Sequence, residues 1–218
     1  MLQVNTKQAR FNMVEQQIRP WDVLNQQVLD IISELPREDF VPTDYRNLAF
    51  ADINIPLAHD QEMMSPKLEG RILQTLQLTS KDSVLEIGTG SGYLTALLAK
   101  SAQHVDSVDI YEDFVTEASS KLKALNINNI SLQTGDGING WNLSTRYDAI
   151  VLTGSVALLK SHFQEQLNEG GRLVAIVGNE PIMQVQLITR IAGNFYTESL
   201  FETQLPPLLG TPVENFVL

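Results

Sequence analysis

Hydrophobic residues follow two different patterns along the chain. In residues 1–78 they recur at helical spacing, most clearly over 14–32 and 68–78, with prolines and an irregular stretch between. From Ser80 onward, short apolar runs alternate with amphipathic segments of helical length. The first pattern predicts a cap of helices and loops, and the second predicts strands that are separated by helices.

The region after Ser80 contains seven segments that we expect to form strands: SVLEIG (83–88), HVDSVDI (104–110), ISLQTGD (130–136), YDAIVLTG (147–154), RLVAIVG (172–178), MQVQLITRIAG (183–193) and FYTESLFETQL (195–205). A helix is expected over 159–170, ended by Gly170 and Gly171. Strands that alternate with helices form a parallel sheet, and two adjacent final strands add an antiparallel edge. The prediction is an α/β, Rossmann-like fold, with a mostly parallel seven-stranded sheet, helices on both faces and an N-terminal helical cap.

Composition narrows the classes of function. The chain has 218 residues, of which 43% are hydrophobic and 19% charged, which is enough to build a sizeable core. Its formal net charge of −11 argues against a nucleic-acid partner. The chain has no cysteine, and its three histidines lack the spacing of metal ligands, so we expect no metal. No apolar run approaches the roughly 20 residues of a membrane helix, and the polar start does not resemble a signal peptide. We therefore expect a cytoplasmic protein without a membrane partner.

A glycine-rich turn follows the first expected strand. It consists of Gly88, Thr89, Gly90, Ser91 and Gly92. Glycines let a ligand approach the backbone closely, and the start of the following helix offers free N–H groups. This context favours a ligand site at the carboxyl ends of parallel strands over tight strand-to-helix packing alone. The GxGxG spacing and the preceding Glu86 favour a ligand with a cationic amino group, because a carboxylate would repel the pyrophosphate of a dinucleotide.

Two further acids end the next two expected strands. Asp109, followed by Ile110, ends the second strand, where an acid typically binds ribose hydroxyls. Asp136 ends the third strand beside Gly137, and its carboxylate suits an exocyclic adenine amine. Either acid alone is also explained as a helix cap. Together with Glu86, however, they describe a ligand with an amino group, a ribose and an adenine but no phosphate. The prediction is S-adenosylmethionine, with Glu86 and the glycine-rich turn at its methionine end.

Several motifs resemble those of one enzyme family. VLEIGTGSGY (84–93), TGDGINGW (134–141), YDAIVLT (147–153), LNEGGRLVAIVG (167–178), PREDFVP (36–42) and AFADINIPL (49–57) are similar to motifs of the protein-L-isoaspartate O-methyltransferases. The resemblance implies a class I methyltransferase fold and S-adenosylmethionine-dependent O-methylation of isoaspartyl residues in damaged proteins. It implies an N-terminal helical cap with the acceptor-site loop in 1–78 and the cofactor-binding domain in 79–218, packed as one compact unit.

The chain departs from the family in the segment that covers the cofactor. The family has a QTISQP- or TISAP-like segment, whose serine hydroxyl is implicated at the acceptor site. The corresponding residues here are QEMMSP (61–66), so that Glu62 and Met64 occupy the threonine and serine positions when the prolines are aligned. The resemblance therefore implies Ser65 as the nearest hydroxyl. We expect Gln61 and Ser65 to be the catalytic residues, lying over the sulfonium.

The sequence leaves alternatives for the methyl acceptor. A carboxylate, with a pKa of about 4, is already ionised at neutral pH and needs no general base, so its site leaves little trace in a sequence. Two other functions stay open: a methyltransferase of this fold with another acceptor, and a cofactor-binding module that has lost catalysis. His59 would be a candidate base for a different acceptor, or an ordinary loop residue. An NAD-dependent oxidoreductase fits the glycine spacing less well.

Overall fold

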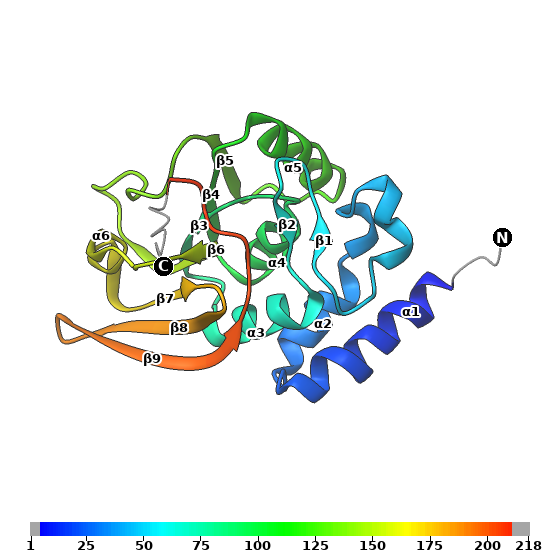
Figure 1. Ribbon diagram of the computed structural model, residues 1–218, viewed down its shortest axis with the longest axis horizontal. Coiled ribbons are helices and arrows are strands. Elements are labelled where there is room, and N and C mark those ends of the chain that lie inside the picture. The colour runs from blue at the N-terminus through cyan, green and yellow to red at the C-terminus, as the bar shows by residue number, and fades with distance from the viewer. Residues whose placement is uncertain (1–4, 211–218) are drawn as a thin grey trace, which may run out of the picture.

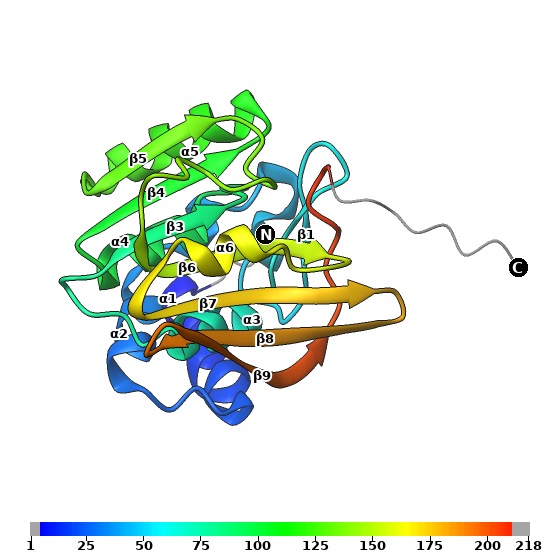
Figure 2. The same cartoon turned by 90° about the vertical axis from the view of Figure 1, so that its left-hand side faces the viewer.

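A seven-stranded sheet runs through the centre of the molecule (Figure 1). The computed structural model describes residues 5–210. From edge to edge the strands are β5 (Ile130–Thr134), β4 (His104–Asp109), β3 (Ser83–Ile87), β6 (Tyr147–Val156), β7 (Leu167–Asn179), β8 (Ile182–Ile191) and β9 (Asn194–Thr203). The first five strands are parallel, and β8 and β9 are antiparallel additions at one edge. Figure 2 shows this order from top to bottom, and it confirms the predicted sheet.

Alternation along the strands sorts the buried side chains onto two faces of the sheet. On β3, Val84 packs on one face and Leu85 on the other. Three helices cover the first face together with the N-terminal region: α3 (Pro66–Leu76), α4 (Tyr93–Ser101) and α5 (Glu112–Ala124). The second face is covered by the short α6 (Ser161–Glu165) and by side chains of the 138–141 segment. Helices therefore lie on both faces, as predicted, but the second layer is thin.

The N-terminal region is mainly helical. It consists of α1 (Thr6–Met13), which continues into the π-helical turn η1 (Val14–Ile18), then η2 (Arg19–Trp21), α2 (Gln26–Glu34), η3 (Arg37–Asp39) and η4 (Thr43–Leu48). A two-stranded hairpin of β1 (Ile55–Pro56) and β2 (Glu62–Met63) adds an element that the sequence did not predict. The domain boundary after residue 78 stays a prediction. No helix within residues 5–210 is long and apolar enough to cross a membrane.

One predicted helix is wrong in its extent. The sequence predicts a helix over 159–170, but α6 spans only Ser161–Glu165. β7 already begins at Leu167, which pairs with β6, and the pairing register shifts directly after that pair. Gly170 and Gly171 lie within this irregular start of β7, and Gly170 has a φ of +77°. The two glycines therefore serve a bulge in a strand and do not end a helix.

A buried ion pair joins the N-terminal cap to α3. The Arg37 side chain is fully buried, and its guanidinium pairs with the carboxylate of Glu69 on α3. Its Nε donates to the carbonyl of Ala49 at 3.0 Å, and its Nη2 donates to the carbonyl of Met64 at 2.6 Å. The guanidinium also lies 4.8 Å from the centre of the Tyr93 ring. Each nitrogen of the guanidinium thus has a hydrogen-bond partner, as a buried charge requires.

Replacing Arg37 with alanine is expected to lower the free energy of unfolding by about 3–5 kcal/mol, because Glu69 would stay buried without its partner. Urea unfolding followed by circular dichroism measures the change. Arg19→Ala is the control, since Arg19 pairs with Glu15 on the half-exposed surface of a helix. That pair is expected to contribute less than about 1 kcal/mol. Equal losses in the two variants would contradict the role of the buried pair.

Candidate active site

The glycine-rich turn after β3 requires its glycines for conformation and for packing. Gly88 has a φ of +100° and Gly90 a φ of +50°. A Cβ atom on Gly88 would collide with the hydroxyl of Thr153 on β6. That hydroxyl donates to the carbonyl of Gly88 at 2.6 Å and lies 3.0 Å from the carbonyl of Ile87. Gly92, with a φ of +83°, precedes the first residue of α4. The turn is therefore held close to β6, and the backbone at Gly88 and Gly90 faces a pocket.

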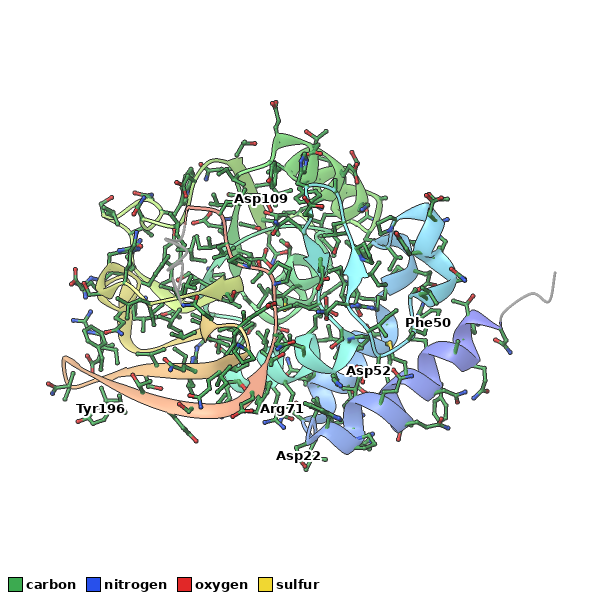
Figure 3. All side chains as sticks on the ribbon, viewed as in Figure 1. Asp22, Phe50, Asp52, Arg71, Asp109 and Tyr196 are labelled. Carbon is green, nitrogen blue, oxygen red and sulfur yellow. The ribbon has the colours of Figure 1, made fainter. Side chains whose placement is uncertain are left out.

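This pocket, of about 650 Å³, lies at the carboxyl ends of β3, β4, β5 and β6. Seven of the residues expected from the sequence line it: Gln61, Gly88, Gly90, Asp109, Ile110, Asp136 and Gly137. In Figure 3, Asp109 lies on the side of the molecule opposite to Arg71 and Tyr196. The structure therefore brings these seven residues together at one pocket, and their contact with a ligand stays a prediction.

Asp109 connects the pocket to the glycine-rich turn. Its Oδ2 accepts the backbone N–H of Gly90 at 2.8 Å, and its Oδ1 accepts that of Tyr111 at 3.0 Å. Burial raises the pKa of the Asp109 carboxyl, while the backbone N–H groups oppose that rise. A carboxylate oxygen has more than one acceptor position, so both oxygens keep the capacity to accept a ligand hydroxyl.

Asp136 lies in a turn whose glycines pack against large side chains. Its Oδ1 accepts the backbone N–H of Ile138 at 3.0 Å. A Cβ atom on Gly137 would lie 2.8 Å from the side chain of Ile87, and one on Gly135 would lie 2.6 Å from the ring of Trp141. The turn thus packs tightly between the side chains of Ile87 and Trp141. Its backbone and Asp136 line the pocket.

A second, smaller pocket of about 290 Å³ adjoins the first. Four residues line both pockets: Glu62, Gly88, Gly90 and Thr153. We call the place where the pockets meet the junction, and define it by these four residues. Thr89 and Ser91, both expected at the ligand, line the smaller pocket together with Met64, Glu69 and Leu94. The two pockets therefore lie side by side along the glycine-rich turn.

Glu86 does not line either pocket, contrary to the expectation that it contacts the ligand. It is fully buried, and its Oε2 accepts from the hydroxyl of Thr95 at 2.5 Å and from that of Ser107 at 2.6 Å. The Ser107 hydroxyl is also 2.7 Å from that of Thr89. Burial raises the pKa of the Glu86 carboxyl to about 8. Glu86 therefore supports the turn from beneath, through Ser107 and Thr89. Gly92 lies outside both pockets as well.

Ser65 also lies away from the cavity. It is buried at the N-cap position of α3, and its backbone N–H donates to Oδ1 of Asn54 at 3.0 Å. Ser65 lines neither of the two pockets. The expectation of a Ser65 hydroxyl at the acceptor is therefore corrected: because Pro66 starts the helix, Ser65 belongs to the helix start, while Met64 and Glu62 face the cavity.

A loop between β1 and β2 covers the larger pocket. His59 stacks on the Tyr111 ring, with centroids 3.7 Å apart and planes within 6°, and its Nε2 lies 2.8 Å from Oδ2 of Asp113. His59 itself does not line the pocket, but Leu57 and Gln61 on either side of it do. These contacts give His59 a loop-holding role and do not support a role as a base for another acceptor.

The segment after β9 closes the opposite wall. Ser155 of β6 donates its N–H to the carbonyl of Pro206 at 3.0 Å and its hydroxyl to that of Leu205 at 3.0 Å. The N–H of Leu208 donates to the carbonyl of Ser155 at 2.9 Å. Leu208 and Thr153 are wall residues that the sequence-based search missed. Thr153 lies near the carboxyl end of β6, so the motif YDAIVLTG could have indicated it. Leu208 is placed by its backbone hydrogen bond to Ser155 of the same strand.

Comparison with known proteins decides the family. The family model of protein-L-isoaspartate(D-aspartate) O-methyltransferase matches residues 8–211. A protein-L-isoaspartate O-methyltransferase of Aliivibrio salmonicida is 36% identical over 202 residues, which cover 93% of this chain and 97% of the relative. One of Dictyoglomus turgidum is 35% identical over 188 residues, 86% of each chain. This chain belongs to the protein-L-isoaspartate O-methyltransferase family.

Solved structures of family members show the same fold. One protein-L-isoaspartate O-methyltransferase, at 23% identity, gives a TM-score of 0.77 and covers 91% of this chain, which spans 65% of that longer chain. A Plasmodium falciparum structure of the same family name, solved with S-adenosyl-L-homocysteine, gives 0.77 at 18% identity and covers 94% of this chain and 98% of its own. The family resemblance expected from the motifs is therefore confirmed, together with the methyltransferase fold.

Replacing Glu86 with glutamine is expected to flatten the dependence of stability on pH. The folded-state pKa of about 8 lies above the ordinary value of 4.5, so the stabilisation by the protonated carboxyl is complete below about pH 4.5 and is lost as the pH rises toward 8. The wild-type protein should lose more stability over this range than Glu86→Gln. Melting temperatures at a series of pH values measure the difference, and parallel curves would contradict the assignment.

Proposed function

We propose that this chain transfers a methyl group from S-adenosylmethionine to the free carboxylate of L-isoaspartyl residues in cytoplasmic peptides and proteins. One observation carries the proposal: in a member of this family, Asp109, Asp136 and the glycine-rich turn reach a single pocket from three strand ends. That arrangement supports a ligand that contains an adenosine and an amino acid but no phosphate.

The residues present fit S-adenosylmethionine. Asp109 with Ile110 would hold the ribose, and Asp136 with Gly137 the adenine. The turn from Gly88 to Ser91 would hold the methionine end in the smaller pocket. A Cβ atom on Gly90 would meet only Leu57, at 3.5 Å, so the backbone of the turn is open to a ligand. Glu86 and Gly92 would act beneath the turn, without contact to the ligand.

When bound, S-adenosylmethionine supplies a methyl group on a positively charged sulfur, which leaves as a neutral thioether. The protein's own contribution is then to position the acceptor in line and to exclude water. The β1–β2 loop with Gln61 and the segment with Leu208 cover the pocket from two sides. We propose Gln61 as the polar side chain that orients the acceptor, and no base is required for an acceptor that is already ionised.

The wild-type protein is expected to transfer label from methyl-labelled S-adenosylmethionine to an isoaspartyl peptide and not to the matching aspartyl peptide. The label should be released by base, because a methyl ester hydrolyses readily. Binding of S-adenosylmethionine without labelling of this peptide would reject the isoaspartyl acceptor. Turnover on another class of acceptor would then favour a methyltransferase of this fold with a different acceptor. Absence of turnover on any acceptor would favour a cofactor-binding module that has lost catalysis.

Asp109→Asn is expected to weaken S-adenosylmethionine binding by about tenfold or more, because a charged hydrogen-bond acceptor at the ribose is lost. Asparagine is preferred to alanine, because its amide oxygen can still accept one of the two N–H groups, of Gly90 and Tyr111, that Asp109 accepts. Isothermal titration calorimetry measures the affinity. Asp30→Asn, on an exposed position of α2, is the control with the same change in charge. Unchanged affinity in Asp109→Asn would reject the ribose assignment.

A further inference from the structure

Glu62 brings the ionisable side chain to the junction of the two pockets. The other three junction residues are Gly88, Gly90 and Thr153. The two glycines have no side chain and contribute only backbone atoms to the junction. The Thr153 hydroxyl is neutral and is directed at the carbonyls of Ile87 and Gly88. Of the four junction residues, Glu62 is therefore the one that carries a charge; the carboxylate of Asp109 lies next to the junction and accepts the N–H of Gly90 at 2.8 Å.

The Glu62 carboxylate is held in place but its charge is not neutralised. Asn54 donates its Nδ2 to Oε2 of Glu62 at 2.9 Å, while its own Oδ1 accepts the N–H of Ser65. Pairing of Glu62 with Pro56 in the hairpin fixes the backbone. Within residues 5–210, no Lys, Arg or His forms an ion pair with Glu62. The second carboxylate of the smaller pocket, Glu69, differs because Arg37 pairs with it.

A ligand that spans both pockets must pass its central atoms through the junction. The inference rests on the proposed function, in which adenosine lies in the larger pocket and the amino acid in the smaller one. The sulfur joins those two halves, so it lies at the junction. That sulfur is positively charged in S-adenosylmethionine and neutral in the product S-adenosylhomocysteine. A carboxylate fixed nearby attracts the first and not the second.

We propose that Glu62 is a charge-specificity residue, which favours the sulfonium substrate over the thioether product and disfavours acceptors whose negative charge is not offset by a neighbouring cation. Product release is thereby favoured after each transfer. The same charge repels an isoaspartyl carboxylate, so the preferred acceptors carry a Lys or Arg beside the isoaspartate. Glu62 thus restricts the range of peptides that the site accepts.

The test compares dissociation constants for S-adenosylmethionine and S-adenosylhomocysteine by calorimetry in the wild-type protein and in Glu62→Gln. Glutamine keeps an acceptor for Asn54 and removes only the charge. The preference for S-adenosylmethionine is expected to fall by about tenfold in the variant, and to fall in the wild-type protein when salt is raised. Asp60→Asn is the matched control, because Asp60 is an exposed acid of the same loop that lines neither pocket.

A second readout uses two isoaspartyl peptides, one with Lys and one with Glu beside the isoaspartate. The ratio of their kcat/KM values should favour the Lys peptide in the wild-type protein, and this preference should shrink in Glu62→Gln but not in Asp60→Asn. If Glu62→Gln binds S-adenosylmethionine and S-adenosylhomocysteine with the wild-type affinity ratio, the inference about Glu62 is overturned and the proposed function still stands. If neither ligand binds the wild-type protein, the proposed function fails and the inference fails with it.

Discussion

Arg37 is a buried cation at the point where three separate segments of the cap region meet. Its guanidinium bonds the carbonyl of Ala49, the carbonyl of Met64 and the carboxylate of Glu69. Because a buried guanidinium is stable only when its N–H groups are all bonded, the backbone at Met64 is tied to the core. The neighbouring residues Gln61 and Glu62 enter the cavity from this anchored segment. The part of the site that we propose for the acceptor thus depends on a buried charge pair that also stabilises the fold.

The sheet could be predicted because its central strands, such as β3 and β6, are almost continuously buried, and because recognisable helices separate the parallel strands. Seven apolar runs become seven strands, and the final antiparallel pair follows from the short turn between β8 and β9. Errors arose where elements are too short to show a period. The β1–β2 hairpin has two residues in each strand, and α6 ends at Glu165 because β7 starts pairing with β6 at Leu167. Tertiary pairing decided these places, and local pattern did not.

The residues of the candidate site also differ in whether the local sequence pattern could reveal their position. Asp109 and Asp136 could be found because an acid at the end of a parallel strand reaches the same edge as its neighbours. Glu86 was assigned to the ligand, yet side chains alternate along β3, so Ile87 faces the larger pocket while Glu86 points under the turn. Ser65 failed for a different reason. A residue directly before the proline at the start of α3 occupies the cap position, and this geometry was readable in the Ser65-Pro66 pair.

The two glutamates of the smaller pocket show why position in the fold decides chemistry. Glu69 is buried and is bonded to a guanidinium, so its charge is balanced within the protein. Glu62 is exposed and bonded to a neutral amide, so its charge remains available to whatever crosses the junction. A site for an anionic acceptor would ordinarily exclude such a charge. Its presence is consistent with methyl transfer only if the sulfonium, or a cation on the acceptor, balances it. In the proposal made for Glu62, this charge bears on which peptides are methylated, and the Rossmann-like core that binds the methyl donor can remain as it is.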